Sequence, residues 1–473
     1  MTETASDLYS SIMFNGLALI TESKARFTQR SIEMHDLLVR NASVLNPDMS
    51  ISEHKDVFVD GNTISSIADT SAVSEASKII DGTGKLVMPG FVDSHTHLCQ
   101  TLLRGRTIEE WPMIWTRFLI PFESNLTEED VYWGAQLACL EMIKSGTTAF
   151  IESGGIHMAD VAEATIKAGL RAAIAKSTMD MGGVIPASMK ETVDECMTAT
   201  EELYNKYNGA GDDTIRIWFA MREVMTCSPE LIRETAKRAA ALNTGIHAHL
   251  CEHHDEVKFC LENYHLRPAE LLEENGMLGP NFLSAHNVSL TEHDITILKK
   301  YDAKIVHCPT SNLSNHGFPK TPRFLDEGMV VALGSDGASS TSLSLFEKMR
   351  LMRYAMTAYW GIPVFDSRVM LCLDLMKMAT VNGARAMLRD DFGTVEAGMK
   401  ADFITLNIDQ PHIQPTSSLL KTLVTNAGPG DVCDSVINGK IVMENRNVLT
   451  LDEKKVMEEC TKRQKEIFAR AGI

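Results

Sequence analysis

Eight short apolar runs of the kind that forms buried β-strands follow one another between residues 91 and 336. Amphipathic stretches separate most of them, and eight strand–helix units in roughly 250 residues fit a closed parallel (β/α)8 TIM barrel. An open doubly wound sheet is disfavoured, because it usually carries a glycine-rich phosphate turn after its first strand. The runs are Phe91–His97, Thr147–Ser153, Arg171–Thr178, Ile215–Arg222, Gly245–Glu252, Phe282–Asn287, Ala303–Pro309 and Val330–Asp336.

Three predicted helices bear on this architecture. Thr127–Ser145 has a capping pair in Thr127 and Asp130, and Gly146 follows it as a stop signal. Ser344–Ser367 and Val369–Met387 read as further helices. The methionines of the first of these, Met349, Met352 and Met356, are more typical of a core than of a ligand site.

Short strands joined by turns dominate both ends of the chain. Asp36–Ala42, Asp56–Ile64 and Ser77–Gly82 precede the barrel, and Ala401–Leu406 and Ser435–Val442 follow it. We expect residues 35–88 and 400–450 to form one composite β-sandwich, with two separate β caps as the alternative. The remaining divisions are an N-terminal extension (residues 1–34), a catalytic domain (residues 89–399) and a C-terminal helix (residues 451–473).

The composition excludes several classes of partner. A net charge of −18 and a pI near 5.3 argue against nucleic acids and anionic membranes. The sequence has no apolar run near the ~20 residues of a membrane span and no signal peptide at its start. Ten cysteines lie without paired spacing. Such thiols are typical of a reducing compartment, so we expect a cytoplasmic protein.

Histidines and acids stand at the ends of four of the predicted strands. His95 and His97 are two residues apart, so their imidazoles point to the same side of a strand, an arrangement that suits a divalent transition metal. The fifth, sixth and eighth strands end in His249 with Glu252, in His286, and in Asp336. Each residue alone is more typical of packing. All of them at the carboxyl end of one barrel, where such barrels carry their active sites, predict a metal centre.

These motifs resemble the amidohydrolase superfamily. Within it they are most similar to the group of S-adenosylhomocysteine/methylthioadenosine deaminases and s-triazine hydrolases. The resemblance covers roughly residues 35–450 and implies a composite β-sandwich beside a distorted TIM barrel. It is carried by Pro89–His97, Thr101–Gly105, His249–Glu252, Ser284–His286, Ser311–Leu313, Leu333–Ala338, Leu345–Arg350 and Thr394–Asp402.

The resemblance also implies a mechanism. One divalent metal, zinc as first choice and iron as the alternative, would lower the pKa of a water so that hydroxide attacks an amidine-like carbon and ammonia leaves. Asp336 would accept the water proton, Glu252 would protonate the ring nitrogen, and His286 would orient the water. The implied metal ligands are His95, His97, His249 and Asp336.

Four residues are candidates for substrate binding. Glu123 matches a position that contacts substrate in the adenosine-type deaminases, and Trp111 could wall a flat heterocycle. Arg222 stands where those enzymes carry a histidine; it suggests a carboxylate or a phosphate on the ligand, or an ion pair with Glu223. Ser340 follows Asp336 in a turn that helps to close the pocket.

The sequence therefore predicts a metal-dependent aminohydrolase that acts on a small aminated heterocycle. An adenosine-type nucleoside or thio-nucleoside is the first choice of substrate. An s-triazine-type hydrolase that displaces an amine or a halide is the alternative. A non-catalytic scaffold is the remote third reading, and it is disfavoured because such a protein would be expected to lose metal ligands. We also expect a homo-oligomer.

Overall fold

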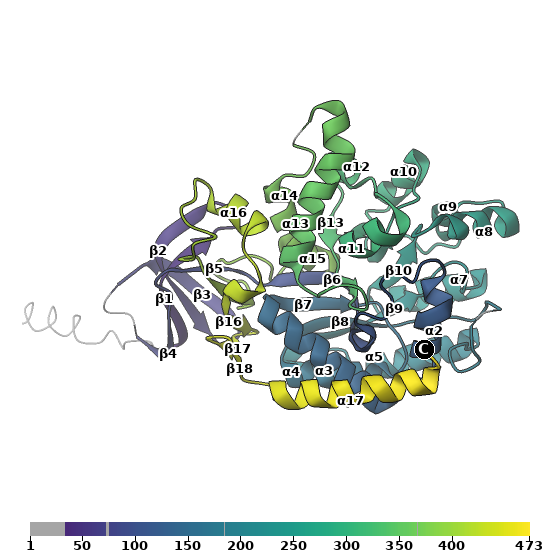
Figure 1. Cartoon of the computed structure of the whole chain (residues 1–473), viewed down its shortest axis with the longest axis horizontal. Coiled ribbons are helices and arrows are strands. Elements are labelled where there is room, and N and C mark those ends of the chain that lie inside the picture. Colours follow the sequence, from purple (N-terminus) through teal and green to yellow (C-terminus); the bar gives the residue numbers. More distant parts are fainter. Residues whose placement is uncertain (1–33, 72–74, 184, 367) are drawn as a thin grey trace, which may run out of the picture.

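A computed structural model describes residues 34–71, 75–183, 185–366 and 368–473 (Figure 1). All but the last residue of the predicted N-terminal extension therefore lies outside the described residues. The chain forms a barrel and, beside it, a sheet built from both ends of the described chain. No helix among the described residues is long and apolar enough to cross a membrane.

A parallel sheet forms the barrel, and its strands follow the predicted order. The first eight strands each pair with their neighbours along the chain, as expected for consecutive βα units. The last run differs from the prediction, because it is two short strands rather than one. The strands are β6 (Phe91–His97), β7 (Thr147–Glu152), β8 (Arg171–Lys176), β9 (Ile215–Met221), β10 (Ile246–Leu250), β11 (Phe282–His286), β12 (Lys304–His307), β13 (Val331–Leu333) and β14 (Asp336–Gly337).

The barrel closes where the chain passes from β13 to β14, because these two strands pair with opposite edges of the parallel sheet. β13 pairs with β12 at one edge of the sheet, and β14 pairs with β6 at the other edge, through Asp336–Thr96 and Gly337–His97. At Gly334, between the two strands, an added Cβ would lie 2.8 Å from the Cβ of His95. A glycine is therefore required there, because the chain passes directly against the first metal-ligand candidate.

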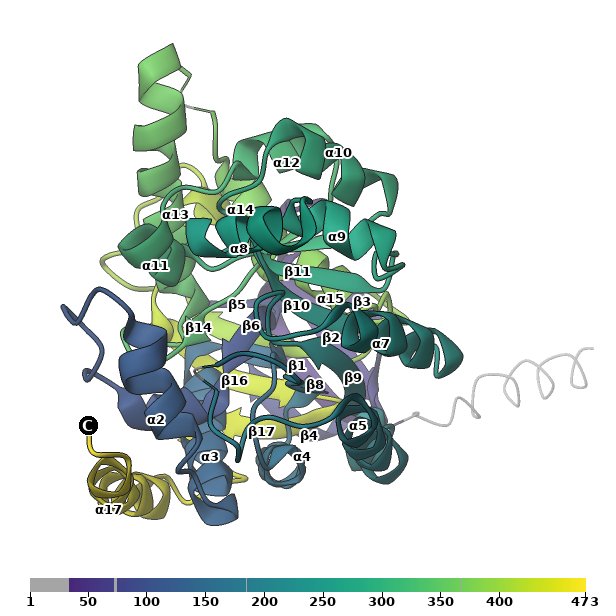
Figure 2. The same ribbon diagram turned by 90° about the vertical axis from the view of Figure 1, so that its right-hand side faces the viewer.

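Helices surround the barrel strands (Figure 2). The predicted helix at residues 127–145 is confirmed with both caps: Thr127 and Asp130 form a capping box, and Gly146 ends the helix at φ 88°. The principal helices are α3 (Glu128–Ser145), α4 (Met158–Ala168), α5 (Val193–Tyr207), α7 (Pro229–Ala241), α8 (His254–Tyr264), α9 (Pro268–Glu274), α10 (Glu292–Lys300), α12 (Thr321–Asp326) and α17 (Glu453–Ala471). Shorter ones are α2 (Ile120–Glu123), α6 (Ala210–Asp213), α11 (Pro309–Ser311) and α16 (Leu419–Thr425).

The two helices predicted after the barrel are each interrupted. Helix α13 (Leu345–Met356) ends early and continues as a π-turn and a short 3-10 turn to Val364. The next predicted helix is two, α14 (Cys372–Ala379) and α15 (Val381–Ala386), because Thr380 leaves the helical region at φ −129° and ψ −98°. The three methionines of α13 are fully buried, as predicted for core residues.

The interior of the barrel is filled by small side chains around one large one. Trp218 belongs to the same buried cluster as alanines of other strands, such as Ala149 and Ala173. An added Cβ at Gly245 would lie 2.3 Å from the Trp218 ring. Successive strand residues alternate between this inner cluster and the larger cluster that contacts the helices, as a closed barrel requires.

The sheet beside the barrel joins the two ends of the chain, which excludes two separate caps. Strand β5 (Lys85–Pro89) pairs antiparallel with β15 (Phe403–Asn407). The predicted composite β-domain is one connected set of nine strands. Its other strands are β1 (His35–Leu45), β2 (Ile51–Asp60), β3 (Thr63–Asp69), β4 (Ala76–Asp81), β16 (Val432–Ile437), β17 (Lys440–Glu444) and β18 (Asn447–Val448).

Candidate metal centre and active site

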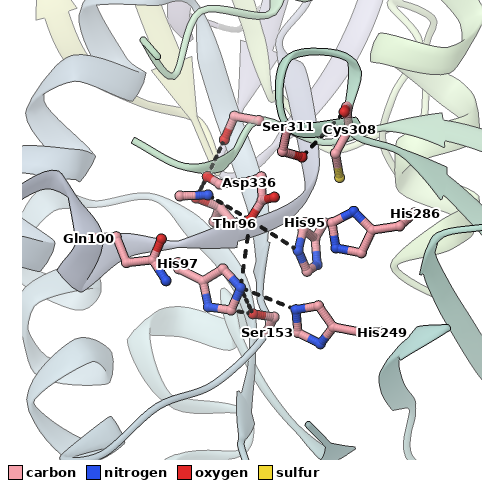
Figure 3. A network of polar contacts seen from close by, with 12 residues as sticks. His95, Thr96, His97, Gln100, Ser153, His249, His286, Cys308, Ser311 and Asp336 are labelled. Atoms are coloured by element: carbon pink, nitrogen blue, oxygen red, sulfur yellow. Dashed lines mark hydrogen bonds and ion pairs between the residues drawn. The ribbon is translucent and has the colours of Figure 1, made fainter. Parts of the chain in front are cut away.

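Three imidazoles and one carboxylate meet at the carboxyl ends of the barrel strands (Figure 3). β6 supplies His95 and His97, β10 supplies His249, and Asp336 begins β14. Oδ1 of Asp336 lies 3.5 Å from Nε2 of His95 and 3.7 Å from Nε2 of His97. Nε2 of His249 lies 3.3 Å from Nε2 of His97. The sequence therefore predicted the members of this cluster, although their role as ligands stays a prediction.

The donor atoms fit a divalent cation. Nε2 of His95 is buried and has no hydrogen-bond partner among the described residues. Ligand atoms of His95, His97 and Asp336 lie within 4.8 Å of one another, as do those of His95, His249 and His286. Burial holds the pKa of His97 and of His249 well below the usual value, so both rings are neutral, as metal ligands must be.

The carboxylate of the cluster is ionised. Burial alone would raise the pKa of Asp336, but the close contact with His95, together with the nearby His286 and His97, outweighs it. The pKa of Asp336 is therefore held well below its usual range. Nitrogen ligands with one carboxylate are a common donor set for zinc and for other divalent transition metals.

Each of the three imidazoles has a partner at its Nδ1, and Oγ of Ser153 also lies 3.0 Å from Nε2 of His97. Nδ1 of His249 donates to the carbonyl oxygen of Arg222 at 2.7 Å. Nδ1 of His97 lies 2.8 Å from Oγ of Ser153, and Nδ1 of His95 lies 2.9 Å from Nε2 of His247. Such outer contacts fix the orientation of metal-binding imidazoles. His247 was not predicted from the sequence, although its position two residues before His249 places it on the same face of β10.

The predicted proton-transfer residues lie beside this cluster. The carboxylate of Glu252 lies 3.8 Å from Nε2 of His286 and 3.0 Å from Nε2 of His316. Burial would raise the pKa of Glu252, but these two imidazoles outweigh it and lower that pKa below its usual range. Sequence reasoning missed His316, which ends a π-helical turn after β12 and belongs to no recognised motif.

Glu123 and Arg222, both predicted to bind substrate, contact each other. The guanidinium donates to both carboxylate oxygens, at 3.2 and 3.3 Å, and Gln100 donates to the same carboxylate at 2.9 Å. The expected alternative of an Arg222–Glu223 pair is wrong as the principal contact, since Glu223 lies instead 3.8 Å from His253. A buried ion pair thus stands close behind the metal cluster.

The other two substrate-binding candidates lie further out. Trp111 is 68% exposed in the loop after β6. Ser340 is half-buried in the loop after β14, where the neighbouring Ser339 carbonyl accepts from the amide of Gly105. A cavity of about 210 Å³ reaches Arg222 from the side of β8 and is also lined by Ser177 and Met179. The roles of Trp111 and Ser340 stay predictions.

Two further features concern the thiols and one buried acid. All ten cysteines are free.

Glu152, at the end of β7, accepts from the amide of Leu98 at 2.8 Å and so holds the turn that follows His97. Burial raises the pKa of Glu152 to about 8. The sequence offered no signal for this contact.

Curated relatives match nearly the whole chain. A 5-methylthioadenosine/S-adenosylhomocysteine deaminase from Thermoanaerobacter pseudethanolicus is 35% identical over 441 residues, which cover 92% of this chain and 100% of the relative. A 5'-deoxyadenosine deaminase from Methanosarcina acetivorans is 34% identical over 449 residues, which cover 93% and 100%.

Solved structures share the fold. An adenosine deaminase from Xanthomonas campestris with bound zinc gives a TM-score of 0.86 at 26% identity, over 92% of this chain and 99% of that chain. An atrazine chlorohydrolase from Arthrobacter aurescens, complexed with zinc, gives a TM-score of 0.84 at 22% identity, over 90% and 100%, and this likeness shows the fold alone. Residues 86–442 also match the model of the Amidohydrolase family. The chain therefore belongs to the amidohydrolase family.

Proposed function

We propose that the protein is a zinc-dependent aminohydrolase that deaminates the adenine ring of a nucleoside or thio-nucleoside. The candidates are 5-methylthioadenosine, S-adenosylhomocysteine and 5'-deoxyadenosine, which the names of the relatives contain. The observation that carries the proposal is the convergence of His95, His97, His249 and Asp336, with Glu252 and His286 directly beside them.

In this proposal the three histidines and Asp336 hold the metal. A bound zinc ion supplies Lewis acidity, which makes water nucleophilic near neutral pH. The ionised Asp336 is suited to take a proton from the attacking water. Ligand atoms of Asp336, Glu252 and His286 lie within 4.8 Å of one another, so protons have short paths between them.

In the proposed reaction, a C–O bond replaces the C–N bond at the ring carbon that carries the amine. The water oxygen forms a C–O bond, and Glu252 protonates the adjacent ring nitrogen. Glu252 is ionised at rest, so it first has to gain a proton, from water or by way of Asp336. The ring nitrogen keeps that proton. The second proton of the water passes from the new hydroxyl to the exocyclic amine, the C–N bond breaks, and the products are the oxo compound and ammonia.

The ion pair behind the metal cluster supports a role in substrate recognition. Three donors contact the Glu123 carboxylate, which leaves about one lone pair on Oε2 to accept from a ribose hydroxyl. Arg222 stands where a histidine is expected in adenosine-type enzymes. We assign Trp111 and Ser340 to the outer wall of the same pocket. We also propose the division into residues 35–88 with 400–450, 89–399 and 451–473, a cytoplasmic location and a homo-oligomer.

An ammonia-release screen of the purified, zinc-loaded protein tests the proposal. We expect release from the three adenine nucleosides and none from guanine, cytosine or an s-triazine. Release from the triazine alone would favour the alternative hydrolase. A protein that binds no metal and gains no activity with zinc would favour a scaffold and overturn the proposal.

Two variants test the assigned roles. His286→Ala should abolish turnover while the zinc content stays near one per chain. Full activity of that variant would contradict the role given to His286. Arg222→His should raise the turnover of adenine nucleosides, and unchanged kinetics would remove Arg222 from the pocket.

A further inference from the structure

We propose that Asn312 is a positioning residue that keeps the ring hydrogen of His286 on Nε2. In that tautomer His286 donates a hydrogen bond into the reacting centre and is excluded from the set of metal ligands. The inference rests on the proposed function for its kinetic consequence, but the tautomer itself is a property of the fold.

The orientation of the Asn312 side chain is fixed by its surroundings. Asn312 is fully buried, after the end of β12. Its Oδ1 accepts from the backbone amide of Cys308 at 3.1 Å, and the backbone amide of Asn312 donates to the Cys308 carbonyl at 3.0 Å. Because a backbone N–H can only donate, the oxygen of the side-chain amide must face Cys308. The NH2 group therefore faces the other way.

The NH2 group of Asn312 meets His286. Nδ2 of Asn312 lies 3.0 Å from Nδ1 of His286. An amide nitrogen donates and does not accept, so Nδ1 of His286 has to be the acceptor and carries no hydrogen. This contact disfavours the Nδ1–H tautomer and the imidazolium alike, since each would set two donors against each other. The single ring hydrogen is left on Nε2.

The Nε2–H of His286 points toward the reacting groups. It is buried and has no hydrogen-bond partner among the described residues. The carboxylate of Glu252 lies 3.8 Å away, beyond direct hydrogen-bond distance but within reach through one small group. Figure 3 shows the ring of His286 beside those of His95 and His249. The small group between Nε2 of His286 and the Glu252 carboxylate would be a water or the exocyclic nitrogen of a substrate.

The contrast with His249 separates ligand from donor. Behind His249 stands a carbonyl oxygen, that of Arg222, which requires a hydrogen on Nδ1 and leaves the lone pair of Nε2 free for a metal. Behind His286 stands an amide NH2, which requires the opposite tautomer. His286 therefore cannot serve as a third imidazole ligand with His95 and His249, although its position alone would permit it.

The test exchanges the donor for an acceptor of the same shape. In Asn312→Asp one carboxylate oxygen still accepts from Cys308, while the other draws a hydrogen onto Nδ1 of His286. Nitrogen NMR of the zinc-loaded protein, labelled at its histidine ring nitrogens, reads the tautomer, and a His286→Gln variant identifies the signals. Asn281→Asp is the matched control, because Asn281 precedes β11 at its opposite end and donates to the Thr244 carbonyl at 2.8 Å.

We expect wild-type His286 to show a hydrogen on Nε2 alone, and the Asn312→Asp variant to gain one on Nδ1. With the best substrate of the screen, kcat and kcat/KM should fall together by ~100–1,000-fold, because the donor acts mainly in the transition state. Zinc content should stay near that of the wild type, and the control should keep its kcat within about threefold, since it leaves the His286 contact intact.

Several results would overturn the inference. They are a hydrogen on Nδ1 in the wild type, an unchanged ring in the variant, loss of zinc from the variant, and a changed ring with unchanged kcat. The wild-type spectrum decides the tautomer even if the variant does not fold. If no substrate releases ammonia, the proposed function fails, while the spectra still decide which nitrogen carries the hydrogen.

Discussion

Arg222→Met should destabilise the protein far more than the loss of one exposed charge would. The side chains of Arg222 and Glu123 are only 6% and 2% exposed, and the guanidinium supplies two of the donors that satisfy the Glu123 carboxylate. Without them Glu123 keeps only the neutral donor of Gln100. Breaking a buried ion pair in this way costs about 3–5 kcal/mol, because the remaining charge is left in a poorly solvated site.

The size of the melting shift follows from the length of the chain. An unfolding entropy near 2.1 cal/mol/K per residue gives roughly 1 kcal/mol/K for 473 residues. The expected decrease in Tm is therefore ~3–5 °C, measured by calorimetry at one scan rate and with saturating zinc, since bound metal itself stabilises the folded state.

Two further variants make this experiment decisive. The double variant Glu123→Leu/Arg222→Met removes both charges, so it should recover much of the loss. Arg216→Met breaks a pair with Asp213 whose side chains are 27% and 57% exposed, and it should cost no more than ~1 kcal/mol. A Tm decrease for Arg222→Met as small as that of Arg216→Met, or a double variant as unstable as the sum of its singles, would refute the reasoning.

Three other predictions concern the metal centre, a glycine beside it and Lys348, a buried lysine of α13. His247→Ala should weaken zinc binding by ~10–100-fold in a chelator competition, because His95 loses the partner of its Nδ1, and unchanged affinity would contradict that role. Gly334→Ala should cost about 1–3 kcal/mol and lower zinc occupancy, because its Cβ would lie 2.8 Å from that of His95; wild-type Tm and occupancy would show that the site tolerates the methyl group. Burial lowers the pKa of Lys348 to about 8. The folded state therefore releases this proton at lower pH than the unfolded state. Wild-type stability should rise by about 2 kcal/mol relative to Lys348→Met between pH 8 and 10, and parallel Tm curves would exclude the effect.

The strands were predictable because buried parallel strands are continuous apolar runs. Phe91–His97 matches β6 at both ends, and several other strands begin where the sequence indicated. The predicted ends run too far, as at Glu252 and Asn287, because polar residues at the mouth of the barrel continue the run after the ladder has stopped. The break at Gly334 escaped prediction, since one apolar run gives no sign that its two halves pair with opposite edges.

The sequence predicted which residues form the site, but not the hydrogen bonds and ion pairs between them. Motifs named the residues that converge, because strand ends in a closed barrel share one face. The partner of Arg222 was missed, since Glu123 lies far away in the sequence and Glu223 is adjacent. The functions of His247 and Asn312 depend on which ring nitrogen faces which donor, and only the three-dimensional arrangement holds that information.

The pairing of β5 with β15 has a consequence for how the chain is made. The partner of Leu86–Pro89 is encoded about 310 residues later, beyond the whole barrel. At ~5–20 residues per second, a ribosome needs roughly 15–60 s to reach it. In the last part of that interval, after Asp336–Gly337 has been made, the nascent protein carries an open, apolar strand edge next to a barrel whose strands have all been synthesised. Until Phe403–Asn407 emerges, this edge is the place where the unfinished protein is most exposed to aggregation and to capture by chaperones.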